Sequence, residues 1–369
     1  MKLSCILVHY HTPELLKRAV SAIEKDASTS ALDVDIIVVD NGSTEKDRAL
    51  LKSLDVKHID PGSNLGYAGG VNLGVKHSDS DVFILMNPDV EVLPGCIESL
   101  ANALGNAASA AGPRFYMDHG KQIALPPLVW LTRMNEIIWR SSVLSRGQAR
   151  RVRNYWRKHA KKQWLATQPV LNYHLTGALL AITRRAWEQV GSFDEVFKLY
   201  FEEVDWLMRL RRKGLKAYYV PSAEAIHLVN QSAIKEKLSK KWYADSLAIY
   251  RRRYYGALFT AFLEHVVPAL RGFLNKIQNG SEEVYETAVP SIDLSRFKSV
   301  SEKPLWIEIS VNRLGIPALG VPIYSRDICK WEFPETEWNA LEPGKYYLRL
   351  VDNDGRELDT LKIFHKITE

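Results

Sequence analysis

Residues 34–43 read VDIIVVDNGS. Six residues rich in β-branched side chains, a composition typical of a buried strand, run into DNGS (40–43), which favours a turn. An earlier apolar run, LSCILVH at 3–9, is followed by a helical pattern, and a later run, VFILM at 82–86, stops at NPD (87–89). The sequence therefore alternates strands with helices from its beginning.

This alternation predicts an α/β fold. Strands that are separated by helices form a mostly parallel sheet with right-handed crossovers. Ligands bind such sheets at the carboxyl ends of the strands. The polar residues at 40–43 and 87–89 each follow a strand, so we predict a binding site where these two strands end.

The pattern changes twice further along the chain. Between about 122 and 168, aromatic and basic residues interleave without strand periodicity, which we interpret as a helical insertion near the site. Beyond a polar linker the character is β, and Asn353-Asp354-Gly355 between apolar alternations predicts a hairpin. We predict an α/β domain at 1–240 that contains the insertion, a helical segment and linker at 241–290, and a small β-sandwich at 291–369.

The composition is that of a globular protein. Of 369 residues, 46% are hydrophobic and 25% charged, which argues against long disorder. The three cysteines are far apart and fit no metal-ligand spacing, so a reducing compartment is the simpler interpretation. The first strand begins almost at Met1, and no apolar run approaches the roughly 20 residues that span a bilayer. We expect a cytoplasmic protein that has no signal peptide and does not cross a membrane.

The net charge of +6 is concentrated in two stretches, 146–162 and 235–253. Such stretches contact nucleic acid, anionic lipid or phosphorylated substrates, or they are solvated helix faces. The sequence contains no nucleic-acid-binding motif, so nucleic acid is not an expected partner. The basic insertion and an amphipathic stretch at 254–274 suggest association with the inner face of a membrane, and packing against the rest of the chain is an equal alternative. The oligomeric state cannot be predicted.

Several motifs occur in a characteristic order. They are VVDNGS (38–43), NLGYAGGVNLG (64–74), LMNPDV (85–90), TGALLAITRRAWEQVGSFDE (176–195), YFEEVDWLMRL (200–210) and PSAEAIH (221–227). Together they resemble glycosyltransferase family 2, particularly its rhamnosyltransferase-like branch. The resemblance covers about Leu3 to Arg253 and implies a GT-A fold, Mg²⁺ or Mn²⁺, and an inverting transfer of a sugar such as rhamnose. The donor would be a dTDP- or UDP-sugar and the acceptor a glycan or lipid-linked glycan, in cell-surface polysaccharide synthesis.

The resemblance assigns the nucleotide-sugar site to the strand ends and the glycine-rich segment. Asp40 would accept a hydrogen bond from the base or ribose, although Asp also favours turns. The glycines permit close backbone approach to a diphosphate, and equally permit tight turns. Tyr10 could also be a core residue. Thr176-Gly177-Ala178 would line the donor sugar pocket, and a core strand that needs small residues is an equal alternative. The expected contacts are Val8, Tyr10, Asp40, Gly66, Gly70, Asn72, Asn87, Thr176 and Gly177.

Asn87-Pro88-Asp89 occupies the place of the family's Asp-x-Asp metal motif. A carboxylate at a strand end binds Mg²⁺ or Mn²⁺, because these ions prefer oxygen and bridge phosphates. Asn87 offers a carbonyl oxygen but one charge less than Asp, so Asp89 is the expected ligand. His227 matches a downstream histidine that completes the metal site in many relatives, and a structural histidine is an equal alternative.

Three acids lie within FEEVD at 201–205. The macrodipole favours acids at a helix N-terminus, yet three neighbouring carboxylates repel one another, which favours a functional role. The family's catalytic base, usually Asp, corresponds to Glu203, which would take the proton of the attacking hydroxyl in a single displacement. Glu202 is the second candidate, and Asp205 is expected to orient or cap.

Two other functions stay open. A nucleotidyltransferase could share the sheet and the metal carboxylate, but it would not account for the order of the motifs. A non-catalytic carbohydrate-binding or scaffold protein on a degenerate transferase fold would account for the departures at Asn87 and Glu203. A processive polysaccharide synthase is disfavoured, since the sequence has neither transmembrane helices nor a Gln-x-x-Arg-Trp motif.

Overall fold

The computed structural model describes residues 1–106, 108–128, 131–228, 239–266, 284–285, 289–297, 304–324, 328–358 and 362–366. The chain divides into two compact units. The first comprises Met1–Phe115 and Ala166–Thr260, and the second comprises Tyr116–Leu165 and Ala261–Glu369. This division by contacts differs from the domains expected at 1–240, 241–290 and 291–369, which stay a prediction.

Within the described residues of the first unit, nine strands form one mixed sheet, ordered β3-β2-β1-β4-β8-β6-β9-β5, with β7 paired to β9. The four strands β3, β2, β1 and β4 are parallel, and β8 is antiparallel to β4. The α/β class predicted from the alternating pattern is confirmed. The strands are β1 (Lys2–His9), β2 (Asp33–Asp40), β3 (Lys57–Ile59), β4 (Val82–Met86), β5 (Val90–Val92), β6 (Ala110–Tyr116), β7 (Val170–Leu171), β8 (Leu179–Thr183) and β9 (Ala217–His227).

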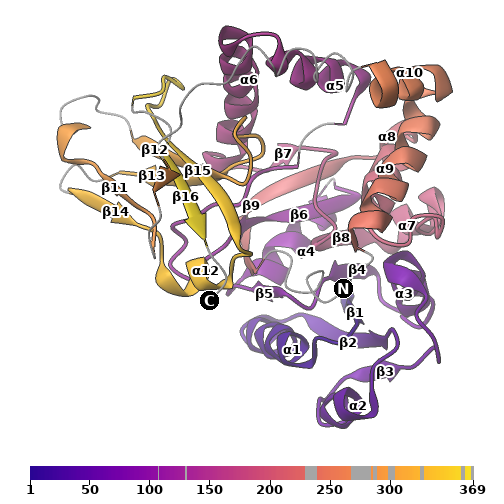
Figure 1. Cartoon of the computed structure of the whole chain (residues 1–369). Helices are drawn as coiled ribbons and strands as arrows, with labels where there is room; N and C mark the ends of the chain where they lie inside the picture. Colours follow the sequence, from indigo (N-terminus) through magenta and orange to yellow (C-terminus); the bar gives the residue numbers. More distant parts are fainter. Residues whose placement is uncertain are drawn as a thin grey trace. The chain divides into compact units, whose positions relative to one another are not determined.

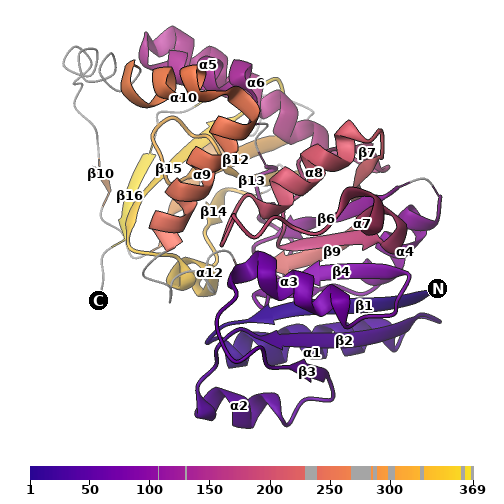
Figure 2. The same ribbon diagram turned by 90° about the vertical axis from the view of Figure 1, so that its right-hand side faces the viewer.

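Helices cover both faces of this sheet, and Figures 1 and 2 show α1 and α3 on opposite sides of β1 and β2. The helices are α1 (Pro13–Ala27), α2 (Glu45–Leu51), α3 (Gly66–Lys76), α4 (Cys96–Asn106), α7 (Arg184–Val190), α8 (Glu202–Arg212), α9 (Ser239–Tyr255) and α10 (Ala257–Ala261). α3 lies close to β1 because it presents glycine there. A Cβ at Gly70 would come within 2.7 Å of a Val8 methyl group. The helix is thereby held with its first turn at the end of β1.

The second unit is built on a five-stranded sheet ordered β10-β16-β15-β12-β13 and a two-stranded sheet of β11 and β14, counted over its described residues. Ile292 and Trp331 of the small sheet share one apolar core with Ile307 and Leu348 of the large sheet, as the predicted β-sandwich requires. The strands are β10 (Val284–Tyr285), β11 (Ser291–Asp293), β12 (Leu305–Ser310), β13 (Leu319–Ile323), β14 (Lys330–Glu332), β15 (Gly344–Val351) and β16 (Lys362–Lys366), with η3 (Ser295–Phe297) and α12 (Glu335–Ala340) between them.

The predicted insertion is helical and forms α5 (Arg133–Arg140), η1 (Ser141–Val143) and α6 (Arg146–Trp164). It packs against the C-terminal strands, where the Trp164 and Trp306 rings stack with centroids 5.3 Å apart. The stretch expected at 254–274 begins with α10 and the π-helix η2 (Phe262–Val266). Its remainder, and most of the linker expected at 279–302, lie outside the described residues. No described helix combines the length and hydropathy that crossing a bilayer requires.

Candidate active site

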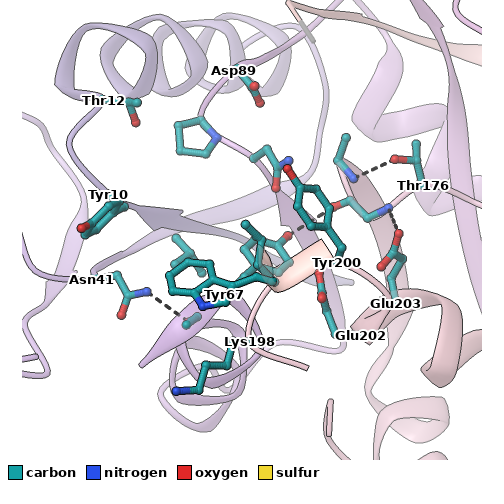
Figure 3. A pocket seen from close by; sticks show the side chains of 18 of the residues that line it. Tyr10, Thr12, Asn41, Tyr67, Asp89, Thr176, Lys198, Tyr200, Glu202 and Glu203 are labelled. Carbon is teal, nitrogen blue, oxygen red and sulfur yellow. Dashed lines mark hydrogen bonds between the residues drawn. The ribbon is translucent and has the colours of Figure 1, made fainter. Parts of the chain in front are cut away.

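A cavity of about 220 Å³ opens where the parallel strands of the first unit end (Figure 3). The first turns of α3 and α8 and the start of α9 complete its wall. Because the polar residues after β1, β2 and β4 meet at this edge, the predicted location of the site agrees with the cavity. The wall includes these residues predicted from the sequence: Val8, Tyr10, Gly66, Asn87, Asp89, Thr176, Gly177, Glu202, Glu203 and His227.

Strand pairing brings Asp89 and His227 together. β5 is antiparallel to β9 with Val90 opposite His227, so the residue before β5 lies beside the end of β9. Asp89 Oδ1 is 3.5 Å from His227 Nε2, and the Asp89 side chain is 3% exposed. The backbone N–H of Leu228 donates to the Asp89 carbonyl at 3.1 Å and closes this end of the pairing.

The chemistry of this pair fits a hard divalent cation. A carboxylate and an imidazole are both ligands of Mn²⁺, and Mg²⁺ is held by one or two carboxylates together with phosphate and water. In the parts of the chain that the structure describes, no group of three or more His, Cys, Asp or Glu side chains is arranged to hold a metal. Asp89 and His227 therefore form a partial ligand set that the oxygens of a diphosphate would complete.

An unusual turn directs two glutamates into the cavity. α8 begins at Glu202, directly after Tyr200 (φ 67°) and Phe201 (φ 73°). Positive φ is uncommon in residues other than glycine, and such strained backbone clusters at functional sites. Both Glu202 and Glu203 line the cavity, and Figure 3 shows their side chains on the same side of the Tyr200 ring.

Burial raises the pKa of both carboxyl groups, because the charged form loses its hydration. The pKa of Glu202 lies well above its usual range, since the neighbouring Glu203 carboxylate also opposes its ionisation. Backbone N–H groups at the helix start and at Gly177 partly offset the rise at Glu203. The two carboxyl groups therefore titrate as a pair, and both keep their protons to a higher pH than an exposed glutamate does.

Gly177 and Tyr67 hold the Glu203 side chain in place. The N–H of Gly177 donates to Glu203 Oε1 at 3.4 Å, and a Cβ at Gly177 would lie only 3.1 Å from Glu203 Cγ. Tyr67 Oη donates to the Gly177 carbonyl at 3.2 Å. Burial and three nearby carboxylates raise the pKa of Tyr67 well above its ordinary value, so this phenol stays a neutral donor.

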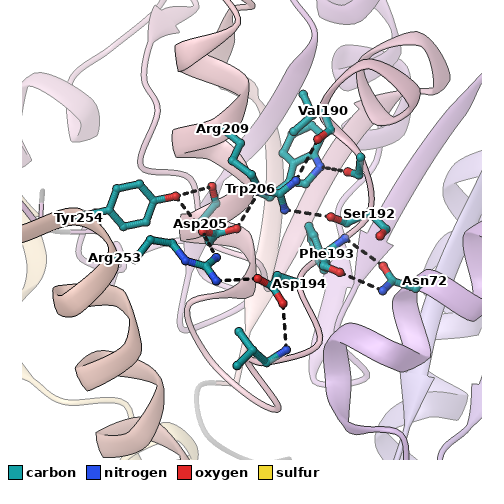
Figure 4. A network of polar contacts seen from close by, with 12 residues as sticks. Asn72, Val190, Ser192, Phe193, Asp194, Asp205, Trp206, Arg209, Arg253 and Tyr254 are labelled. Atoms are coloured by element: carbon teal, nitrogen blue, oxygen red, sulfur yellow. Dashed lines mark hydrogen bonds and ion pairs between the residues drawn. The ribbon is translucent and has the colours of Figure 1, made fainter. Parts of the chain in front are cut away.

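Asp205 lies outside the cavity wall and joins α8 to α9 (Figure 4). Its Oδ2 accepts from Arg209 Nε at 2.8 Å, and its Oδ1 accepts from Arg253 Nη1 and Tyr254 Oη at 2.7 Å each. Arg253 also pairs with Asp194 at 2.7 Å. The carboxylate is saturated by these partners, which suits the orienting role expected for it and leaves no contact with the cavity.

Asp40 is buried just beneath the wall, whereas the adjacent Asn41 lines the cavity. Asp40 Oδ1 accepts from the Ser43 N–H at 2.8 Å, as a turn-forming Asp does. Asn41 Oδ1 accepts from the Leu65 N–H at 2.7 Å, and its Nδ2 donates to the Gly66 carbonyl at 3.1 Å. Asn41 therefore ties the glycine-rich segment to the end of β2, and the role predicted for Asp40 in nucleotide binding stays a prediction.

The structure does not bring Gly70 or Asn72 into the cavity wall. Gly70 faces Val8, where its lack of a side chain allows close helix packing. Asn72 accepts from the Phe193 N–H and donates to the Phe193 carbonyl, both at 3.0 Å. It also donates to Glu195 at 2.9 Å. These contacts position α3, and the contact of Gly70 and Asn72 with a nucleotide sugar stays a prediction.

Several wall residues were not predicted. They are Thr12, Asn64, Tyr67, Lys198, Leu199, Tyr200 and Trp242, whereas Asn41, Pro88 and Ala178 lie within clusters that were expected at the site. Tyr67 stands inside the quoted glycine-rich motif, directly after Gly66, and could have been proposed from that position. Trp242 belongs to α9, and no local pattern indicates that this helix returns to the strand ends.

Comparisons with known proteins identify several proteins with similar sequences. The family model described as glycosyl transferase family 2 matches residues 4–163. One relative is the low-salt glycan biosynthesis hexosyltransferase Agl10 of Haloferax volcanii, to which the chain is 26% identical over 306 residues. The alignment covers 75% of this chain and 91% of Agl10. The chain is also 31% identical over 219 residues to the N-acetylglucosaminyl-diphospho-decaprenol L-rhamnosyltransferase of Mycobacterium tuberculosis. This alignment covers 53% of this chain and 66% of the rhamnosyltransferase.

Among solved structures, the mannosyltransferase PcManGT of Pyrobaculum calidifontis, in complex with GDP-Man and Mn²⁺, matches with a TM-score of 0.47 and 12% identity. The match covers 76% of each chain. Residues 4–163 therefore match glycosyltransferase family 2, and the resemblance to this family predicted from the motifs is confirmed.

Proposed function

We propose that this protein transfers a sugar, with inversion, from a nucleoside diphosphate sugar to a hydroxyl group of a glycan or lipid-linked glycan. One observation carries the proposal: the Asp89–His227 pair and the Glu202–Glu203 pair line the same cavity at the strand ends. The curated relatives are a hexosyltransferase and a rhamnosyltransferase that acts on a diphospho-decaprenol-linked sugar. These relatives support rhamnose or a hexose as the donor sugar and a lipid-linked acceptor in polysaccharide synthesis.

Asp89 and His227 would hold Mg²⁺ or Mn²⁺, which would offset the negative charge that develops on the leaving diphosphate. Asn87 adds a neutral amide to this wall, so the protein supplies a single carboxylate here. Lys198 also lines the cavity, and Figure 3 draws it at the opposite edge of the view from Asp89. We assign its ammonium group to the donor's phosphates, where it compensates for the carboxylate that Asn87 replaces.

Glu203 is the catalytic base in this mechanism. The Gly177 N–H donates to its carboxylate, and Tyr67 in turn donates to the Gly177 carbonyl. Glu203 takes the proton of the acceptor hydroxyl as that oxygen bonds to the anomeric carbon and the bond from this carbon to the diphosphate oxygen breaks. Because the attack comes from the side opposite the leaving group, the anomeric configuration inverts.

We assign the nucleotide to the side of the cavity that the ends of β1 and β2 form. Val8 and Tyr10 at the end of β1 and Asn41 after β2 line that side, and Asp40 lies directly beneath it. The Tyr10 ring is available for stacking on a pyrimidine. A dTDP- or UDP-sugar is therefore the proposed donor.

The test is a thermal-shift screen of dTDP-rhamnose and UDP-sugars with and without Mn²⁺, followed by a transfer assay with the donor that raises the melting temperature. The Glu203→Gln variant should bind this donor normally and transfer it about 10²–10⁴-fold more slowly. The Asp89→Ala variant should lose the Mn²⁺-dependent part of the shift. Undiminished sugar transfer by both variants, or transfer of the nucleotide in place of the sugar, would contradict the proposal.

A further inference from the structure

The helix α6 has one face fixed to the second unit and an opposite face that is basic. Val152, Trp156 and Ala160 are buried on the fixed face. Arg157, 2% exposed, donates two hydrogen bonds to the buried Glu308 carboxylate at 2.6 and 2.8 Å. These contacts hold α6 on the C-terminal strands, so its outer face cannot turn inward.

The outer face carries exposed residues at helical spacing. They are Arg151, Tyr155, Lys158 and Lys162, and Arg146 and Arg150 at the start of the helix are exposed as well. Between 133 and 164 the sequence contains one acidic residue, Glu136, which is buried and pairs with Arg140 at 3.3 Å. The outer face is therefore strongly cationic.

Apolar side chains from α5 and the turn before α6 accompany this charge. Met134 is 65% exposed, Ile137 is 46% exposed and Leu144 is 62% exposed. The hydroxyl of Tyr155 donates to Asn135 Oδ1 at 3.2 Å, which places α5 beside the outer face of α6. Exposed apolar side chains next to a basic helix face are characteristic of proteins that lie on membranes.

We propose that α5, η1 and α6 form a docking surface for an anionic lipid bilayer. The basic face attracts anionic headgroups, and Met134, Ile137 and Leu144 enter the boundary between headgroups and acyl chains. A nucleic acid would satisfy the charges, but it would leave these three apolar side chains in water, so the lipid surface is the better match. The surface belongs wholly to the second unit and involves no residue of the candidate active site.

The test is sedimentation of the full chain with vesicles of phosphatidylcholine, with or without phosphatidylglycerol. The protein should bind only the vesicles that contain phosphatidylglycerol, and less tightly as salt rises. The triple variant Arg151→Gln, Lys158→Gln, Lys162→Gln should bind about a hundredfold more weakly, at about fivefold for each charge removed. The double variant Met134→Ser, Ile137→Ser should also bind more weakly.

A matched control removes three exposed charges from α1, by Lys17→Gln, Arg18→Gln and Lys25→Gln. It should bind vesicles as the unmodified chain does. Equal loss in the control and in the α6 variant, or no binding by the unmodified chain, would overturn the proposal. So would binding that RNA abolishes and that the Met134 and Ile137 substitutions leave unchanged, because the surface would then recognise polyanions. The assay contains no sugar nucleotide, so its outcome is independent of the proposed transfer activity.

Discussion

The substitution Gly177→Ala tests whether close packing at Gly177 positions the catalytic carboxylate. An added Cβ would lie 3.1, 3.2 and 3.3 Å from Cγ, Cδ and Cβ of Glu203. Ordinary carbon contacts need about 3.5–4.0 Å, so Cγ must retreat by about 0.5 Å. Because the side chain pivots near its Cβ, the carboxylate moves further, by on the order of 1 Å. A displacement of that size slows a reaction by about a hundredfold.

The assay separates chemistry from binding and folding. Single-turnover transfer should slow by about a hundredfold, whereas donor affinity, measured by titration, should change little. The free energy of unfolding should fall by about 1–3 kcal/mol, as expected for overpacking. The control is Gly105→Ala in α4, where a new Cβ meets nothing within 4 Å. It should retain full activity and gain about 0.5–1 kcal/mol of stability.

A second substitution distinguishes displacement of the Glu203 carboxylate from general damage to the fold. Combining Gly177→Ala with Glu203→Asp shortens the acid by one methylene and relieves the contact, so the double variant should be faster than Gly177→Ala alone. If Gly177→Ala turned over at the normal rate, or if the shorter acid only slowed it further, the positioning argument would be wrong.

The same structure makes three further predictions. The pKa of Glu202 is raised, so the folded state binds the proton of this carboxyl group more tightly than the unfolded state does. The protonated carboxyl group therefore favours folding at low pH, and this contribution is lost as pH rises through the folded pKa. Glu202→Gln should raise the melting temperature more at pH 8 than at pH 4. Burial lowers the pKa of His9 to about 4, so stability should decline as pH falls from about 6.5 towards 4, and a His9→Phe variant should show a shallower decline in melting curves. Asp205→Asn should lower the free energy of unfolding by about 1.5–3 kcal/mol in urea titrations and reduce turnover, because its charged hydrogen bonds to Arg209 and to Arg253 of α9 are lost. The control Asp245→Asn, on the exposed face of α9, should change neither quantity.

The sheet and the position of the site were predictable because both follow local rules. Apolar runs rich in β-branched residues, such as 34–39, favour strands, and polar residues that follow parallel strands meet at one edge of the sheet. The side chains of the positive-φ turn that precedes α8 could not be placed as reliably. The cavity-lining role of Tyr200 depends on the backbone conformation of Tyr200 and Phe201, which no composition rule predicts.

The contacts of Gly70, Asn72 and Asp205 could not be predicted, for a different reason. Gly70 and Asn72 belong to a motif that favours ligand contact, but their surroundings are Val8 and Phe193, which are far away in the sequence. An orienting or capping role was expected for Asp205, but its partner Arg253, 48 residues later in the sequence, was not. Long-range partners decide the roles of such side chains, and a single sequence contains no signal of them.

The register between β5 and β9 has a consequence for how this protein can vary. Successive side chains of a strand point to opposite faces, so adding or deleting one residue between Asp89 and the end of β5, or at the matching place in β9, would turn His227 away from Asp89. Substitutions on these two strands should be tolerated when volume is preserved, whereas length changes should not. Spacing, more than residue identity, is what natural variants of this edge must keep.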